Sequence, residues 1–177
     1  MSARGVIIRP ARPEDATAMG RVFQESWLAT YPHEGMEITR EDILSLDLAG
    51  EENTQRRFES LTRQDPASRR GVAELNGEII GLFGVELCEG YGYLRALYVL
   101  PEYFSCGIGA ALIVQALKEV EDYETVYLNV ASYNERAIRF YERFGFCDSV
   151  EGPEFTGGHF QSGAYLPQKH MVRRREK

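Results

Sequence analysis

Two glycines stand where an apolar, strand-like stretch of the chain passes into a helical pattern. Residues 93–99 are typical of a β-strand, Pro101 ends it, and Gly107 and Gly109 open a segment with helical spacing. At such a junction successive backbone N–H groups lack partners and the helix dipole is positive, while glycine lets a ligand approach the backbone closely. The chemistry that this pattern predicts is phosphate binding.

Two common nucleotide-binding loops do not fit this stretch. A dinucleotide-binding loop beginning at Gly107 would have glycine or alanine where Leu112 stands, and a Walker loop would need Gly-Lys followed by Ser or Thr. The alternative to a phosphate loop is that the glycines only ease the packing of a helix against a strand.

A second pair of polar residues lies further along the chain, on another predicted helix. Asn134 and Tyr141 are seven residues apart, so they point the same way two turns apart, and Ile138 shares their face. Both polar side chains can therefore face one cleft. The alternative for Tyr141, which lies between Phe140 and Phe144, is a place in the core.

The elements that must position these residues can be read from the chain. Asn76-Gly77 between two apolar runs predicts a tight β-hairpin, and Thr39 with Asp42 predicts a capped helix start. Strand, helix and strand over residues 91–130 predict a parallel crossover. We expect strands at 6–8, 72–75, 78–85, 91–99, 125–130, 146–150 and 164–172, the last two joined by a glycine-rich loop. We expect helices after Pro13, after Thr39, at 54–61, at 107–120 and at 132–144, the last ended by Gly145.

This order of elements, with Asn134-x-x-Ala137-x-x-x-Tyr141-x-x-x-Gly145-Phe146, resembles the GNAT superfamily of N-acetyltransferases. The match covers about 72–150 well and the N-terminal strand and helix loosely, whereas 25–68 match no motif. The resemblance implies one α/β (α+β) domain over 1–177, with a core at 5–172 and a basic, solvated tail at 173–177. Its sheet should be twisted, mixed and mostly antiparallel, splayed at one parallel strand pair, with helices on both faces.

The resemblance also implies that acetyl-coenzyme A is the co-substrate and enters the splay. The family pattern Gln/Arg-x-x-Gly-x-Gly/Ala falls on 104–109, where Phe104 replaces the polar residue, so one polar contact should be missing. Strand residues 97–99 would pair with the pantetheine arm, and the backbone of 105–110 would grip the pyrophosphate. Asn134 would contact the coenzyme, or else serve only the first turn of its helix. The implied coenzyme-binding residues are Leu97, Tyr98, Val99, Ser105, Cys106, Gly107, Ile108, Gly109, Ala110 and Asn134.

Tyr141 matches the family's usual general acid, which protonates the departing thiolate. A phenol suits this role because its reference pKa of about 10 exceeds the value of about 8.5 for a thiol. Some relatives that modify protein N-termini carry a glutamate on the strand before the Asn-led helix, but this chain has Asn129 there. Glu86 is the remaining candidate for a general base, acting through water; the alternative is an exposed glutamate at a strand end.

Composition limits the partners. The chain has 27 acidic and 20 basic residues in 177, and this net charge of −7 disfavours a general nucleic-acid binder. Cys88, Cys106 and Cys147 suggest neither a disulfide framework nor a metal site. Residues 1–5 lack a signal-peptide pattern and no apolar run is long enough to span a membrane, so we expect a soluble, cytoplasmic protein with no membrane partner.

The acceptor is expected to be a primary amine on a small molecule. The unmatched segment should set its identity, and the mixture of acidic and aromatic groups there favours a polyamine or another small cation. The alternatives are an ordinary surface in this segment, a protein N-terminal acetyltransferase, and an acyl-coenzyme A sensor without turnover; a homodimer is left open. The residues of the segment that support a cationic acceptor are Trp27, Tyr31, His33, Glu34, Glu51 and Glu52.

Overall fold

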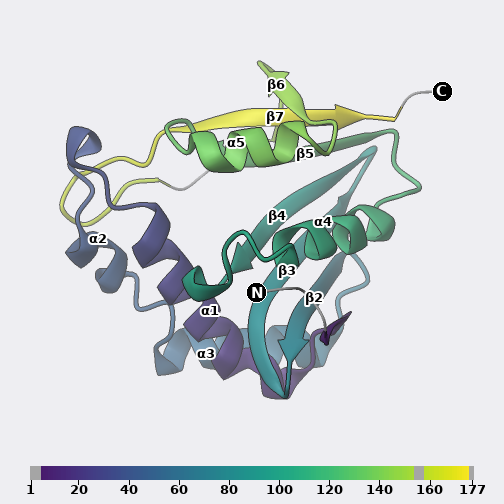
Figure 1. The fold of residues 1–177 in the computed structure, drawn as a ribbon, viewed down its shortest axis with the longest axis horizontal. Coiled ribbons are helices and arrows are strands. Elements are labelled where there is room, and N and C mark those ends of the chain that lie inside the picture. The colour runs from purple at the N-terminus through teal and green to yellow at the C-terminus, as the bar shows by residue number, and fades with distance from the viewer. Residues whose placement is uncertain (1–4, 154–157, 176–177) are drawn as a thin grey trace.

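The computed structural model describes residues 5–153 and 158–175, which form one seven-stranded sheet covered by helices (Figure 1). The strand order is β1-β2-β3-β4-β5-β7-β6, and the neighbours are antiparallel except for the parallel pair β4 and β5. The predicted mixed, mostly antiparallel α/β fold is confirmed. The strands are β1 (Val6–Pro10), β2 (Ser68–Leu75), β3 (Glu78–Cys88), β4 (Tyr91–Val99), β5 (Thr125–Ala131), β6 (Cys147–Ser149) and β7 (Gln168–Arg174).

The helices are α1 (Ala16–Thr30), α2 (Arg40–Ser45), α3 (Glu51–Arg63), α4 (Ile108–Glu119) and α5 (Glu135–Glu142), with short 3-10 turns at 13–15, 34–36 and 101–103. The Thr39 hydroxyl caps α2 by accepting from the Asp42 N–H at 3.1 Å, as the sequence predicts. Of the helices within the described residues, none combines the length and the apolar character needed to cross a membrane.

The hairpin of β2 and β3 turns at Asn76-Gly77, as predicted. Asn76 has φ 51° and Gly77 has φ 85°, the left-handed values that a tight primed turn requires. Across this hairpin Arg70 lies opposite Gly84, and Gly84 in turn lies opposite Ala96 of β4. The middle of the sheet therefore carries two of the smallest side chains next to a long cationic one.

The parallel pair separates soon after it begins. Only Gly92–Leu94 of β4 pair with Val126–Leu128 of β5, although β4 continues to Val99 and β5 to Ala131. Figure 1 shows the two strands diverging, with β5, β7 and α5 on one side and β2 to β4 with α4 on the other. The predicted splay is therefore present, and the ends of both strands face it.

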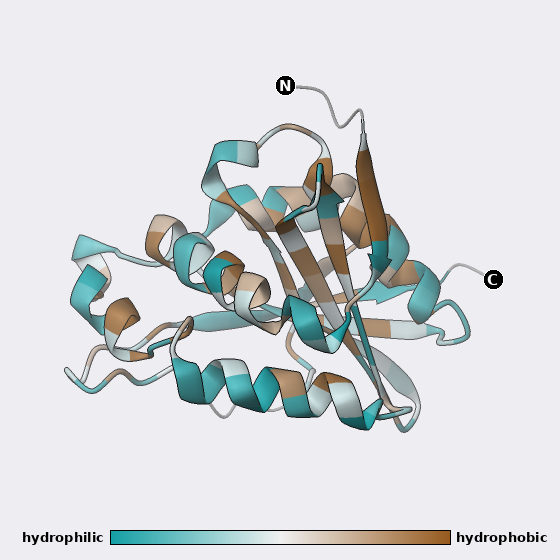
Figure 2. Ribbon diagram, turned by 90° about the horizontal axis from the view of Figure 1, so that it is seen from below, coloured by the Kyte–Doolittle hydropathy of each residue, from teal (hydrophilic) through white to brown (hydrophobic). Residues whose placement is uncertain are grey.

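Helices cover both faces of the sheet. Arg69 Nε lies 4.0 Å from Glu119 at the end of α4, whereas the next residue, Arg70, donates to Ser60 Oγ of α3 at 2.7 Å. Because successive residues of a strand point to opposite faces, α3 and α4 lie on opposite sides of the sheet. The strands between them are rich in apolar residues (Figure 2), and the fully buried side chains include Val72, Ile80, Leu82, Leu112, Ile113 and Leu128.

The last helix begins three residues later than the predicted range of 132–144. Helix α5 begins at Glu135, because Asn134 is its N-cap and its Oδ1 accepts a hydrogen bond from the Ala137 N–H at 3.1 Å. Helix α5 ends at Glu142, two residues before the end of the predicted range, and Gly145 terminates it as predicted. Gly145 adopts φ 83°, and the Phe146 N–H donates to the Tyr141 carbonyl at 3.2 Å, which closes the helix.

The end of the chain also differs from the prediction. Strand β7 starts at Gln168 rather than 164, directly after Pro167, which has no N–H to give to a ladder. It runs on to Arg174, so Arg173 and Arg174 belong to the sheet and not to a solvated tail, since they pair with Val126 and Thr125 of β5. Strand β6 is shorter than its predicted range of 146–150. Residues 1–4, 176 and 177, and part of the predicted glycine-rich loop at 154–157, lie outside the described residues.

Candidate active site

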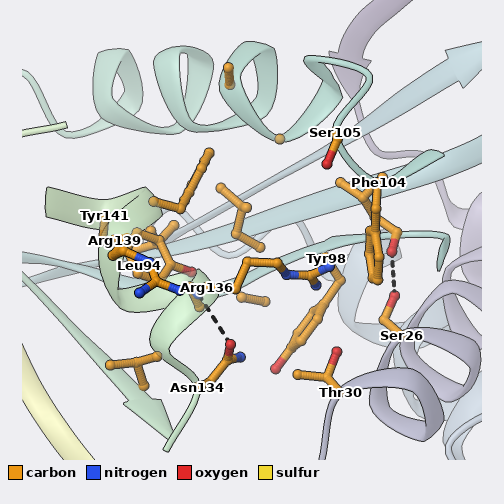
Figure 3. A pocket seen from close by; sticks show the side chains of 18 of the residues that line it. Ser26, Thr30, Leu94, Tyr98, Phe104, Ser105, Asn134, Arg136, Arg139 and Tyr141 are labelled. Carbon is orange, nitrogen blue, oxygen red and sulfur yellow. Dashed lines mark hydrogen bonds between the residues drawn. The ribbon is translucent and has the colours of Figure 1, made fainter. Parts of the chain in front are cut away.

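A cavity of about 560 Å³ lies where β4 and β5 separate, bounded by the glycine loop, the start of α4 and helix α5 (Figure 3). Of the predicted coenzyme-binding residues, Cys106 and Ile108 do not line it. The Ile108 side chain is buried in the core, and Cys106 Sγ lies 3.6 Å from the Phe104 carbonyl oxygen. The predicted residues that do line the cavity are Leu97, Tyr98, Val99, Ser105, Gly107, Gly109, Ala110, Asn134 and Tyr141.

The glycine loop presents its backbone to this cavity. Ser105 (φ 63°) and Gly107 (φ 85°) both adopt left-handed conformations, and Gly107 is the N-cap of α4. The first intrahelical bond runs from the Ala111 N–H to the Gly107 carbonyl at 3.1 Å, which leaves the N–H groups of 107–110 without helical partners. This cradle of N–H groups at the positive end of a helix fits the phosphates of a coenzyme.

Helix α5 adds positive charge that the sequence analysis missed. Arg136, Arg139 and Arg143 line the cavity, and the Arg136 guanidinium carbon lies 3.9 Å from the centroid of the Phe104 ring. No acidic side chain of the described residues lines this cavity. The sequence carries a signal for this group, because spacings of three and four residues place the three arginines on one face of the helix. Arg136 therefore brings a cation to the place where Phe104 replaces the family's polar residue.

Asn134 contributes to the cavity with only part of its amide. Its Oδ1 is held by the Ala137 N–H, so its NH₂ group remains to donate to a ligand. The same residue thus starts α5 and lines the cavity (Figure 3).

Four tyrosines gather around the splay. The hydroxyl oxygens of Tyr31 and Tyr98 are 3.3 Å apart, and the Tyr133 hydroxyl donates to the Tyr31 carbonyl at 2.8 Å. Burial raises the pKa of Tyr31, Tyr98 and Tyr141 above the usual value for a phenol, and raises the pKa of Tyr133 to about 12. Burial favours the neutral form, so all four hydroxyls carry their protons at neutral pH.

A second cavity, of about 690 Å³, lies on the α1 and α3 side of the splay. Its lining shares Tyr31, Arg95, Ala96, Tyr98 and Asn129 with the first cavity, so the two meet around these residues. The glycine loop lines only the first cavity. The two cavities therefore offer separate places for a phosphate-bearing molecule and a second reactant.

The candidate base lies in the second cavity. Glu86 lines it, and one carboxylate oxygen is 3.4 Å from a guanidinium nitrogen of Arg95. The structure therefore separates Glu86 from the glycine loop and places it on the α1 and α3 side of the splay.

Only two of the residues expected to recognise the acceptor line the second cavity. Trp27 and Tyr31 line the second cavity, and their rings are in edge contact with centroids 4.7 Å apart. The remaining residues of that group, His33, Glu34, Glu51 and Glu52, line neither cavity, and the three glutamates are exposed. The arginines Arg56, Arg57, Arg70 and Arg95 line the second cavity instead, and Glu86 is its single acidic side chain among the described residues.

Asn129 lines both cavities and is held from β7. His170 lies directly opposite it in the ladder, and His170 Nδ1 is 2.6 Å from Asn129 Oδ1. Asn129 Nδ2 is buried and has no hydrogen-bond partner within residues 5–153 and 158–175. His170 was not singled out from the sequence, because only the pairing of β5 with β7 brings it here.

Comparison with known proteins agrees with this geometry. The model of the acetyltransferase (GNAT) family matches residues 18–146. The chain belongs to the GNAT acetyltransferase family. The crystal structure of the paia N-acetyltransferase from Thermoplasma acidophilum in complex with coenzyme A superposes with a TM-score of 0.74 at 22% identity, over 96% of this chain and 99% of that one. This likeness shows that the GNAT domain here shares its fold.

Curated GNAT relatives match shorter parts of the chain. An N-alpha-acetyltransferase of Sulfurisphaera tokodaii is 34% identical over 90 residues, which are 42% of this chain and 54% of the relative. The spermidine N(1)-acetyltransferase of Escherichia coli is 38% identical over 112 residues, 57% of this chain and 55% of the relative. The chain thus spans about half the length of the curated relatives that it matches.

Proposed function

We propose that this GNAT domain transfers an acetyl group from acetyl-coenzyme A to a primary amine. The observation that supports it most is the meeting of two cavities at the β4 and β5 splay, one lined by the glycine loop and one without it. Acetyl-coenzyme A supplies the acetyl group as a thioester. The protein's part is to bind the two reactants from opposite sides and to move protons.

The first cavity holds the coenzyme in this proposal. The N–H groups of 107–110 bind its pyrophosphate, and the guanidinium groups of Arg136, Arg139 and Arg143 add charge for its phosphates. Residues 97–99 of β4 lie beyond the last β5 partner among the described residues, so their backbone groups on that side can bond the amides of the pantetheine arm. The Val99 carbonyl also accepts from Ser26 Oγ at 2.8 Å.

Two residues transfer protons, one on each side of the splay. Tyr141 gives its proton to the departing thiolate, and its raised pKa keeps it protonated until that moment. Glu86 takes a proton from the attacking amine, through water. Asn129 does not serve as this base, because a neutral amide accepts no proton near neutral pH.

The relatives favour different acceptors. The spermidine acetyltransferase supports a polyamine, and the N-alpha-acetyltransferase supports a protein N-terminus. The arginines of the second cavity count against a polycation, because like charges disfavour its entry. A sensor that binds acyl-coenzyme A without turnover is the candidate from another class.

A thiol-release assay separates these candidates. Purified protein is given acetyl-coenzyme A with spermidine, with short peptides, and with small amines of varied charge, and free coenzyme thiol is followed with time. Amine-dependent release supports the transferase. Tight coenzyme binding without release from any amine would leave the sensor, and would refute the proposed activity.

A further inference from the structure

The second cavity has a charge that the acceptor must match. Four arginines and one glutamate line it. A guanidinium nitrogen of Arg95 lies 3.4 Å from a carboxylate oxygen of Glu86, and the exposed Arg56 forms an ion pair with Glu52 of its own helix. Both have carboxylate partners within the protein. The other two arginines have none within 4.0 Å among the described residues.

Of these two, Arg57 is committed to the protein itself. One of its nitrogens donates to the Leu48 carbonyl, and its guanidinium lies 5.3 Å from the ring centroid of Phe23. Its other terminal nitrogen is buried against Gly20 of α1, where an added Cβ would come within 2.8 Å of it, and has no hydrogen-bond partner among the described residues. Arg57 therefore supports the wall of the cavity and adds to its positive charge.

Arg70 is different, because its guanidinium keeps nitrogen atoms that are neither hydrogen-bonded to the described residues nor fully buried. Its guanidinium has one side-chain hydrogen bond among the described residues, to the neutral Ser60 hydroxyl at 2.7 Å. Burial lowers the pKa of Arg70 from its ordinary value, and the negative charges of Glu86 and Asp65 oppose this shift only in part. A guanidinium carries five N–H donors in a fork that fits a carboxylate with two parallel bonds. An anion supplied from outside would satisfy it.

The sheet leaves room between Arg70 and the place where the cavities meet. Gly84 lies between Arg70 and Ala96 in the ladder, and a Cβ added to Gly84 would meet only the Ala96 methyl, at 3.8 Å. Neighbouring strands are about 4.8 Å apart, so Ala96 lies about 10 Å from Arg70 across two strand spacings. Ala96 lines both cavities. A small molecule can therefore reach from the guanidinium to the reaction site.

We propose that the acceptor is an amino acid in the broad sense, a small molecule that carries an amine and a carboxylate, and that its carboxylate binds Arg70. The carboxylate is held over Gly84, and the amine faces the tyrosines at the splay. This inference rests on the proposed acetyl transfer, whose acceptor it names by chemical class. It replaces the polyamine expected from the sequence, because the glutamates behind that expectation lie outside the cavity.

Matched acceptor pairs test the charge requirement. Common L-amino acids and straight-chain ω-amino acids are compared with their own carboxamides and with spermidine, at saturating acetyl-coenzyme A. Each carboxamide keeps the amine and the shape but loses the negative charge. We expect at least one acid to exceed its carboxamide by about tenfold or more in kcat/KM. Carboxamides that equal or exceed their acids throughout, or a preference for spermidine or peptides, would overturn the inference.

Neighbouring arginines on β2 provide the matched variants. Arg70→Gln should raise KM for the preferred acid by about tenfold or more and leave its carboxamide unchanged, with Arg70→Lys in between. Arg69→Gln, on the opposite face beside Glu119, should change neither. Coenzyme affinity, measured by calorimetry, should be the same in all three variants and report that they are folded. An equal loss for acid and carboxamide in Arg70→Gln would contradict recognition of the carboxylate.

The acceptor panel tests the carboxylate site and the proposed acetyl transfer separately. Acetylation of amines with no preference for acids would refute the carboxylate site and leave the acetyltransferase standing. Binding of acetyl-coenzyme A with no release by any amine would refute both.

Discussion

The guanidinium of Arg136 lies 3.9 Å from the centroid of the Phe104 ring, joining α5 to the glycine loop over the first cavity. Phe104 occupies the position where the family pattern has Gln or Arg. The phenyl ring cannot make the polar contact that Gln or Arg would make, but its face packs against the Arg136 guanidinium of α5. The positive charge is supplied from α5 instead of from the loop.

This contact predicts that Arg136 contributes to coenzyme affinity. Arg136→Gln should weaken binding of coenzyme A by about tenfold, because a charged hydrogen bond to phosphate is replaced by a neutral one. Calorimetry with the purified variant measures it. Arg63→Gln, at the exposed end of α3 and paired with Glu59, is the control and should bind as the parent does. Equal affinities in the two variants would show that Arg136 does not contact the coenzyme.

The glycine loop gives a second prediction. In Gly107→Val, coenzyme affinity should fall by about tenfold or more, because the side chain obstructs the cradle and β-branched residues resist the positive φ of 85°. Gly77→Val is a matched control, since Gly77 also has φ 85° but lies in the hairpin turn with no atom near its added Cβ. Both variants should lose stability in thermal unfolding. Only Gly107→Val should lose coenzyme binding, and a similar loss in both would mean that strain alone explains it.

The buried tyrosines predict how stability depends on pH. Their pKa values are raised in the folded protein, so between about pH 10 and the higher folded values only the unfolded chain releases these protons. The stability linked to them is complete below about pH 10 and is lost as the pH rises through the folded pKa values. Urea unfolding at several alkaline pH values should show a decline that is shallower in Tyr98→Phe. A decline of equal slope in both proteins would contradict a raised pKa for Tyr98.

Much of the fold follows from local signals. Asn76-Gly77, the Thr39 cap and the Gly145 terminator each act within a few residues, and each appears where the sequence predicts it. The start of α5 was misplaced because Ser132 and Asn134 are both good caps, and only the Ala137 N–H bonded to Asn134 decides between them.

The candidate site was less predictable, because long-range pairing assembles much of it. Strand register brings His170 to Asn129 and aligns Arg70 with Gly84 and Ala96, although these residues are far apart in the chain. The glutamates of the unmatched segment favour a cationic acceptor, but Glu34, Glu51 and Glu52 line neither cavity. The predicted tail had the composition of a solvated end, yet Arg173 and Arg174 complete the ladder with β5.

Removal of the Tyr141 hydroxyl tests the proposed chemistry most directly. Tyr141→Phe keeps the ring, which packs against Phe140 and Phe146, and deletes the only proton that the side chain can give. Single-turnover acetylation of the best acceptor from the amine panel should slow by about 10²–10⁴-fold, with coenzyme affinity and unfolding temperature unchanged. A rate within about twofold of the parent, about 0.4 kcal/mol in the barrier, would contradict Tyr141 as the acid and leave it as a core residue.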